Sequence, residues 1–261
     1  NYLYLFGIVA GLMLAFMAIF IFLVKEVKWT DEMRRESLRL GLETEEDEKV
    51  AKGTKGEKME PAVRRSFILI LLSVFLWFFA YNAASSKLSL YAQNILQIEN
   101  YTFPAMIGFG AALIAFYPIG ILSTKFGRRN MILVGIGVLI LGFILAFIAS
   151  IDLSFGWVIY AAMVVVGFGW AAINVNSYPM VVEMSKGPNI GVFTGYYYAA
   201  SMLAQALTPV ISGLLMDAFG MTLTLFPYAI FFSIAAAVTM FFVKHGESKH
   251  LETKEIQPKT E

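Results

Sequence analysis

Seven long apolar stretches constrain this chain more than any other feature of its sequence. A helix needs about 20 mostly apolar residues to cross the hydrocarbon core of a bilayer. Lipid cannot satisfy open backbone amides and carbonyls, so stretches of this kind must be helical. The sequence therefore predicts an all-α, polytopic membrane protein with seven transmembrane helices. The stretches are Leu3–Val24, Ser66–Ala84, Phe103–Leu122, Met131–Ala149, Phe155–Val182, Ile190–Met216 and Met221–Val243.

The composition indicates lipid-facing helices rather than a large soluble core. Apolar residues make up 58% of the 261 positions and charged residues 15%, whereas a soluble domain carries about 25% charged residues. The net charge of +1 gives no reason to expect a nucleic-acid partner. The chain has no cysteine, which excludes disulfides, thiol catalysis and thiolate metal sites. Both histidines, His245 and His250, lie in the polar tail, so we expect no metal site and no cofactor.

The positions of the basic residues predict the orientation, because lysine and arginine concentrate on the cytoplasmic side of membrane proteins. Nineteen of the 20 lie on one side of the predicted spans, in Lys25–Arg65, Lys125–Arg129, Lys186 and the tail after Val243. Lys87 lies on the other side, where an interfacial lysine can snorkel. We expect a multi-pass protein of the plasma (cytoplasmic) membrane, with its amino terminus outside and its carboxyl terminus in the cytoplasm.

The spacing of the stretches predicts four segments. Residues 1–24 form a single transmembrane helix, residues 25–65 a cytoplasmic linker, residues 66–243 a bundle of six closely connected helices, and residues 244–261 a cytoplasmic tail. The first apolar run has no basic leader and no small-residue cleavage site, so it is not a signal peptide. Because the chain opens at Asn1 within such a run, we expect it to begin partway through a longer protein.

Seven spans with an external amino terminus also describe a heptahelical receptor or a retinal protein. A retinal protein needs a lysine in its last span, and Met221–Val243 has none. The third span does not end in an acidic-Arg-Tyr triplet, and the seventh lacks Asn-Pro-x-x-Tyr. One span, a long linker and six connected spans fit better with a plan in which a cytoplasmic linker joins two six-helix bundles.

The turn between the third and fourth spans carries a family pattern. Gly120 and Gly127 permit a tight turn and close helix approach, and the basic residues hold the turn at the cytoplasmic surface. The turn reads Gly120-Ile-Leu122-Ser-Thr124-Lys125-Phe-Gly127-Arg128-Arg129-Asn-Met-Ile132. It resembles the second-bundle copy of the major facilitator superfamily signature, G-x-L-a-D-r-x-G-R-R-x-x-(I/L). The aspartate of the family is Thr124 here, so the usual local acid–base latch is absent or supplied from elsewhere.

The fifth and sixth spans extend the resemblance over residues 66–243. The run from Gly169 to Glu183 is similar to the tenth helix of the sucrose–proton symporter-like branch, within or beside the glycoside–cation symporters. The run from Gly191 to Asp217 is similar to the eleventh helix. The resemblance implies that the first span is equivalent to helix 6 and that the last six spans form the C-terminal six-helix bundle.

The same resemblance implies a function. The chain would be part of a secondary active transporter that moves a small sugar or glycoside by alternating access, coupled to a proton or cation. Its partners would be the lipid bilayer, the missing N-terminal six-helix half and the small-molecule substrate. A drug or metabolite exporter of the same superfamily and a half-length, non-transporting membrane partner protein remain open. No nucleophile–base pair or phosphate loop occurs in the sequence, so we do not expect an enzyme.

Uncharged polar and aromatic residues within the spans are the candidates for substrate binding. Polar groups in a span are costly, so they face the bundle interior or a water-filled cavity. Amides and hydroxyls can hydrogen-bond a carbohydrate, and an aromatic ring can lie against its C–H face. The same side chains also hold membrane helices together, so packing is the alternative for each. The candidates are Tyr81, Asn82, Trp170, Asn174, Ser177, Tyr197, Ser201 and Gln205.

Charged residues at the cytoplasmic face are the candidates for an inner gate. Glu183 ends the fifth span on the side where Arg128 and Arg129 lie. We hypothesise an ion pair that closes the gate in the outward-facing state and replaces the acid lost at Thr124. A helix-end carboxylate with no partner is the alternative. The last six spans hold no carboxylate deep within them, so we expect a coupling site mainly in the missing first bundle.

Overall fold

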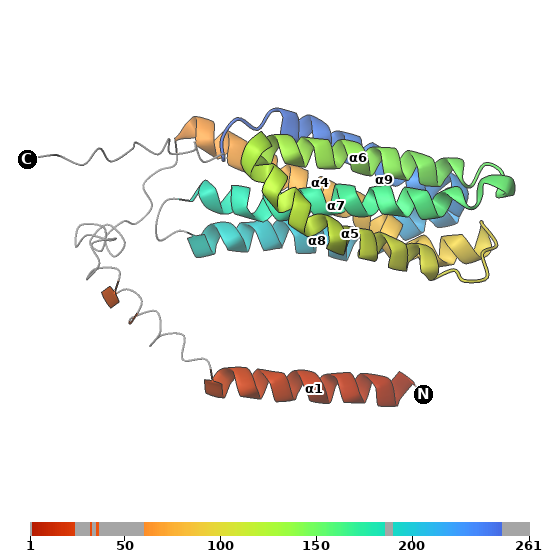
Figure 1. Ribbon diagram of the computed structural model, residues 1–261, viewed down its shortest axis with the longest axis horizontal. Helices are drawn as coiled ribbons and strands as arrows, with labels where there is room; N and C mark the ends of the chain where they lie inside the picture. Colours follow the sequence, from red (N-terminus) through yellow and green to blue (C-terminus); the bar gives the residue numbers. More distant parts are fainter. Residues whose placement is uncertain (1, 24–31, 33–34, 37–59, 186–189, 247–261) are drawn as a thin grey trace, which may run out of the picture. The chain divides into compact units, whose positions relative to one another are not determined.

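The computed structural model describes residues 2–23, 32, 35–36, 60–185 and 190–246. Every regular element among them is a helix (Figure 1), which confirms the predicted all-α class. The chain divides into two compact units, residues 1–57 and 58–261, and each is described by itself. Most of the predicted linker and tail lies outside the described residues, so the four predicted segments remain a prediction.

Among the described residues, the first unit contains α1 (Tyr2–Leu23), and the second contains six further α-helices. All six are long and apolar enough to cross a membrane. Within α1, Phe6–Phe20 forms a shorter apolar helix. A short 3₁₀ turn, η1 (Leu153–Phe155), precedes α7. The six helices are α4 (Pro61–Asn94), α5 (Phe103–Phe126), α6 (Arg128–Ile148), α7 (Val158–Glu183), α8 (Ile190–Phe219) and α9 (Met221–Phe241).

Helix α4 extends well beyond the apolar stretch that predicted it. It begins at Pro61, whose fixed φ suits the first turn of a helix. It continues ten residues past Ala84 because Leu88 and Tyr91 carry its buried face onward at helical spacing. Hydropathy indicates the part of a helix that crosses the hydrocarbon core. Packing against neighbouring helices determines where α4 ends.

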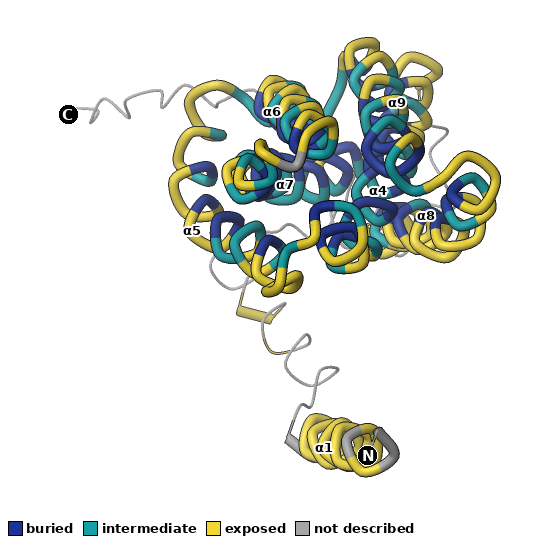
Figure 2. Tube along the Cα trace, turned by 90° about the vertical axis from the view of Figure 1, so that its right-hand side faces the viewer, coloured by how far each residue is buried: buried dark blue, intermediate teal, exposed yellow. Residues whose placement is uncertain are grey.

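The six helices form two interlocked triplets. Helix α4 packs mainly on α8 and α9, whereas α7 packs mainly on α5 and α6. Figure 2 shows α5, α6 and α7 grouped on one side and α4, α8 and α9 on the other. In sequence the helices form two sets of three, α4–α6 and α7–α9. The first helix of each set packs with the last two helices of the other set. This is the arrangement of an inverted repeat, in which the second triplet crosses the membrane in the opposite direction.

Two glycines mark equivalent turns of this repeat. Gly127 joins α5 to α6 with φ 81° and ψ 149°, and Gly220 joins α8 to α9 with φ 81° and ψ 154°. A positive φ is rare for any residue with a Cβ, so both turns require glycine. The spacing that separates these two glycines also separates Trp77 on α4 from Trp170 on α7.

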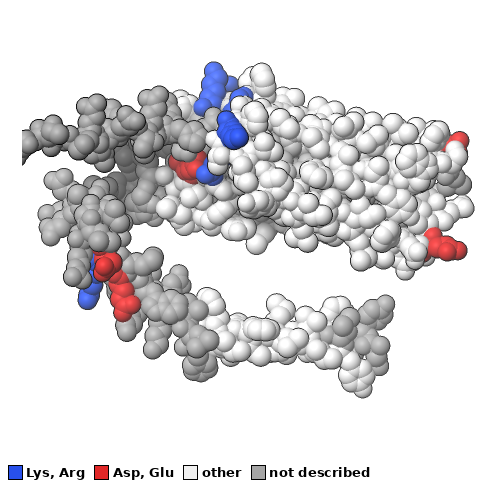
Figure 3. Space-filling model, viewed as in Figure 1, with Lys and Arg blue, Asp and Glu red and all other residues white. Residues whose placement is uncertain are grey.

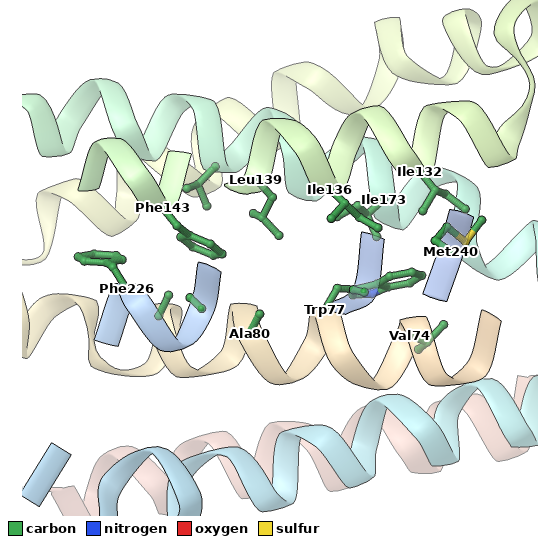
Figure 4. Close-up of a cluster of buried hydrophobic side chains, with 14 of the residues drawn as sticks. Val74, Trp77, Ala80, Ile132, Ile136, Leu139, Phe143, Ile173, Phe226 and Met240 are labelled. Atoms are coloured by element: carbon green, nitrogen blue, oxygen red, sulfur yellow. The ribbon is translucent and has the colours of Figure 1, made fainter. Parts of the chain in front are cut away.

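The core lies where α4, α6, α7 and α9 meet. Trp77 is fully buried and lies beside Ile136 of α6, Ile173 of α7 and Met240 of α9 (Figure 4). Towards the other end of the bundle, Phe226 and Phe143 continue the same cluster. This cluster fixes one face of each of the central helices α4 and α7.

Glycines bring the backbone of α7 unusually close to α5 and α6. A Cβ added to Gly167 would overlap the carbonyl oxygen of Gly108 on α5. A Cβ added to Gly169 would lie 2.7 Å from the backbone nitrogen of Leu139 and 2.8 Å from the carbonyl oxygen of Gly135, both on α6. Contacts of this kind replace the hydrophobic effect as a source of helix association in lipid.

The described charges of the second unit gather at the two ends of the bundle (Figure 3). Glu99, Asp152 and Asp217 lie at one end, called the acidic end here. The backbone N–H of Ser154 donates to Asp152 (2.9 Å), which lowers the pKa of that carboxyl. Lys87 is half-buried on α4, nearer the acidic end. The opposite end, called the basic end, carries Arg64, Arg65, Lys125, Arg128, Arg129 and Lys244. Its location in the cytoplasm remains a prediction.

The close approach at Gly167 can be tested with one added methyl group. We expect Gly167→Ala to lower the free energy of unfolding by about 1–3 kcal/mol, because the methyl must displace the backbone of α5. Gly137→Ala is the control, since nothing lies within 4 Å of a Cβ there. Thermal unfolding in detergent micelles measures the difference. Equal losses for the two variants would contradict the close approach.

Candidate functional site

A stacked aromatic pair joins the two central helices. The rings of Tyr81 on α4 and Trp170 on α7 lie face to face, with centroids 3.7 Å apart and planes 6° apart. Phe78 meets the same indole edge-on at 5.2 Å. Tyr81 and Trp170, both predicted as site residues, are therefore in direct contact. We call this pair the aromatic platform.

Two predicted asparagines near the platform residues in the chain make matching contacts with their own helices. Asn82 Nδ2 donates to the carbonyl oxygen of Phe78 (2.7 Å), and Asn174 Nδ2 donates to that of Trp170 (2.9 Å). A carbonyl oxygen can only accept, so each amide must turn its nitrogen toward its own helix. Among the described residues, each Oδ1 and each second amide hydrogen has no further hydrogen-bond partner, so each can bind another molecule. Both side chains are half-buried.

The three candidates on α8 lie in two different environments. Tyr197 is buried, and its hydroxyl lies 2.9 Å from Ser177 Oγ of α7. Ser201 is 2% exposed and donates to the carbonyl oxygen of Tyr198 (3.1 Å). Gln205 is exposed. Ser177, Tyr197 and Ser201 thus contribute to helix packing, and only Gln205 of the α8 candidates is open to a ligand.

The structure also joins α7 and α8 through a contact that the sequence interpretation missed. The hydroxyl of Tyr178 lies 3.2 Å from Thr194 Oγ1, next to the Ser177–Tyr197 contact. Helical spacing could not predict this contact of Tyr178, because its partner Thr194 is sixteen positions away on another helix. Together the two contacts close the seam between α7 and α8 near the basic end.

The basic end carries one ion pair that matches the gate hypothesis in its residues. Arg128 Nη2 at the start of α6 lies 2.6 Å from Glu183 Oε1 at the end of α7. The two side chains are 32% and 24% exposed. Arg129 has a different role: its Nη2 donates to the carbonyl oxygen of Phe241 (2.6 Å), and its guanidinium lies 5.9 Å from the ring centroid of Phe241.

The two glycines of the turn that carries the family pattern lie in different settings. Gly127 ends α5 and begins α6. Gly120 lies about two turns earlier on α5, and no described residue lies within 4 Å of a Cβ there, so the close helix approach expected at Gly120 is not seen. Thr124 Oγ1 donates to the carbonyl oxygen of Ile121 (2.7 Å). Among the described residues, no group of three or more histidines and carboxylates could hold a metal ion.

Comparison with known families decides the class of this bundle. The family model described as Major Facilitator Superfamily matches residues 1–186 and also residues 105–260. The chain belongs to the major facilitator superfamily. No individual curated protein matches the chain. As a major facilitator protein, it is a multi-pass integral membrane protein and a membrane transporter, and this class agrees with the inverted repeat described above.

The aromatic platform of this major facilitator protein can be tested by a double-mutant cycle. We expect Tyr81→Leu and Trp170→Leu to be coupled by about 0.5–1.5 kcal/mol, because the stacked rings interact beyond the area they bury. Thermal unfolding of the two single variants and the double variant gives the coupling. Tyr81→Phe should retain it. A control cycle pairs Trp170→Leu with Tyr117→Leu, since Tyr117 is 79% exposed. Strict additivity for Tyr81 and Trp170 would contradict the contact.

Proposed function

We propose that this chain is part of a secondary active transporter that moves a small, neutral sugar or glycoside by alternating access. The observation that carries the proposal is the aromatic platform of Tyr81 and Trp170, with Asn82 next to Tyr81 in α4 and Asn174 one turn beyond Trp170 in α7. The candidates that remain for this site are Tyr81, Asn82, Trp170, Asn174 and Gln205. All five are uncharged, so the site would bind a neutral molecule without leaving a charge unpaired.

The amides near the platform suit a polyhydroxylated molecule. A sugar hydroxyl can donate to the free Oδ1 of Asn82 or Asn174 and can accept from the remaining amide hydrogen. The aromatic rings offer an apolar surface for the C–H face of a sugar. Gln205 adds a third amide, on α8. A charged metabolite would find no opposite charge among these groups.

The resemblance of residues 66–243 to the sucrose–proton symporter-like and glycoside–cation symporter branch supports the same substrate class and suggests coupling to a proton or cation. Within this proposal, α1 is equivalent to helix 6, and a second six-helix bundle completes the transporter. The protein lies in the plasma membrane with its basic end facing the cytoplasm. The ion pair of Arg128 with Glu183 closes the cytoplasmic gate.

Uptake into proteoliposomes that contain the complete transporter tests the proposal. We expect at least one of glucose, galactose, sucrose, maltose and lactose to accumulate faster with an inward proton or sodium gradient. Asn174→Ala should lower kcat/KM by about tenfold, since one neutral hydrogen bond contributes up to about 1.5 kcal/mol. No uptake of any of these sugars, with or without a gradient, would overturn the proposal and favour an exporter or a non-transporting partner.

The matched control for Asn174 is Asn130. Asn130 Nδ2 donates to the carbonyl oxygen of Phe126 (3.1 Å), four residues earlier on the chain, as Asn174 does to Trp170. Asn130 is exposed at the basic end, away from the platform. Asn130→Ala should therefore leave kcat/KM unchanged. Equal losses for the two variants would point to a general effect of losing the local contact.

The proposed gate makes a separate prediction. Glu183→Arg and Arg128→Glu should each lower uptake, because two like charges would oppose closure of the basic end. The double charge swap should restore part of the lost uptake. Arg64→Glu, an exposed residue at the same end, controls for the change in net charge. Unchanged uptake in Glu183→Arg would dispose of the gate.

A further inference from the structure

A small cavity lies beside the aromatic platform, in the half of the bundle nearer the acidic end. Its volume is about 30 Å³. Tyr81 is part of both its wall and the platform, so the two features adjoin. Phe143 and Phe226, which Figure 4 shows at the end of the core cluster, also line it. Helices α4, α5 and α7 supply the rest of the wall.

Small residues create this space. Ala84 on α4, together with Ala105 and Gly108 on α5, lines the cavity where larger side chains would fill it. Gly167 of α7 also lines it, and the close contact of Gly167 with Gly108 fixes one wall. The cavity therefore lies where α4 and α5 make few direct contacts with each other.

The lining of the cavity is suited to an apolar group. Tyr81 and Ser85 are the only residues of the lining with a polar side chain, and the others are apolar or glycine. A buried water needs two to four polar partners, and a volume of about 10–15 Å³ already holds one water-sized group. A cavity of about 30 Å³ with so few polar partners is better matched by a methyl-sized group than by water.

We propose that this cavity is a subsite for a methyl-sized apolar substituent of the transported molecule. The inference rests on the proposed function and narrows it: the preferred substrate is a sugar with one small apolar substituent, such as a methyl glycoside or a deoxy sugar. The hydroxyls of the sugar bind Asn82 and Asn174, the ring lies at the platform, and the substituent passes Tyr81 into the cavity.

A size series on the wild-type complete transporter tests the subsite. The probes are the free sugar found to be transported and its methyl, propyl and phenyl glycosides, measured as competitors of labelled free-sugar uptake. We expect the methyl glycoside to bind about fourfold more tightly than the free sugar, from the burial of one methyl group. The propyl and phenyl glycosides should lose this gain because the cavity is too small for them.

Filling the cavity provides the second test. Ala105→Leu and Ala84→Val should abolish the preference for the methyl glycoside and leave uptake of the free sugar near the wild-type level. Ala161→Leu is the matched control, since Ala161 is exposed on α7 and does not line the cavity. The fold of each variant is checked by thermal unfolding, and the size series stands by itself if a variant does not fold.

The outcomes separate the two proposals. A transporter that takes up sugars but shows no preference for the methyl glycoside, or keeps that preference after the cavity is filled, overturns the subsite and leaves the proposed function in place. Affinity that keeps rising from methyl to phenyl also overturns it, because a larger binding region must then exist. Absence of all sugar uptake overturns the proposed function, and the subsite with it.

Discussion

The close backbone contact of α7 with α5 and α6 is the interaction on which the rest of the bundle depends. In lipid there is no hydrophobic drive between helices, so association relies on van der Waals contact at small residues and on polar contacts. Gly167 and Gly169 provide that contact on two sides of α7. Trp170 and Asn174 follow directly on the same helix. The position of the aromatic platform is therefore set by two neighbouring glycines.

Helix α4 is held by different means. Its contacts with α9 and α8 include Ser73 Oγ, 2.7 Å from Thr239 Oγ1, and the longer Thr208 Oγ1 contact with the carbonyl oxygen of Phe79 (3.5 Å). Contacts between side chains keep helices further apart than contacts between glycines. The platform thus joins one helix with tight backbone packing to one held through side chains, and the open space lies beside the latter.

Hydropathy was enough to predict the helical class and the six long spans, because each span must satisfy its backbone hydrogen bonds within the helix. It could not place the end of α4, which depends on Leu88 and Tyr91 meeting their neighbours. Helical spacing placed Tyr197, Ser201 and Gln205 on one stripe, but packing buries the first two and exposes the third. The repeat is visible in the sequence, since Gly-x-Leu-x-x-x-Phe-Gly occurs at Gly120–Gly127 and again at Gly213–Gly220.

Two adjacent arginines at the basic end, Arg128 and Arg129, make different contacts that the sequence could not distinguish. Arg129 binds a carbonyl oxygen of α9 and lies over an aromatic ring of the same residue, so it ties α6 to α9 within the bundle. Arg128 pairs with Glu183 in a partly exposed setting, where an ion pair contributes only about 0–1 kcal/mol. A contact that must break and re-form in each transport cycle needs to be weak. The exposed pair therefore suits the proposed gate, whereas the contact of Arg129 suits a permanent part of the fold.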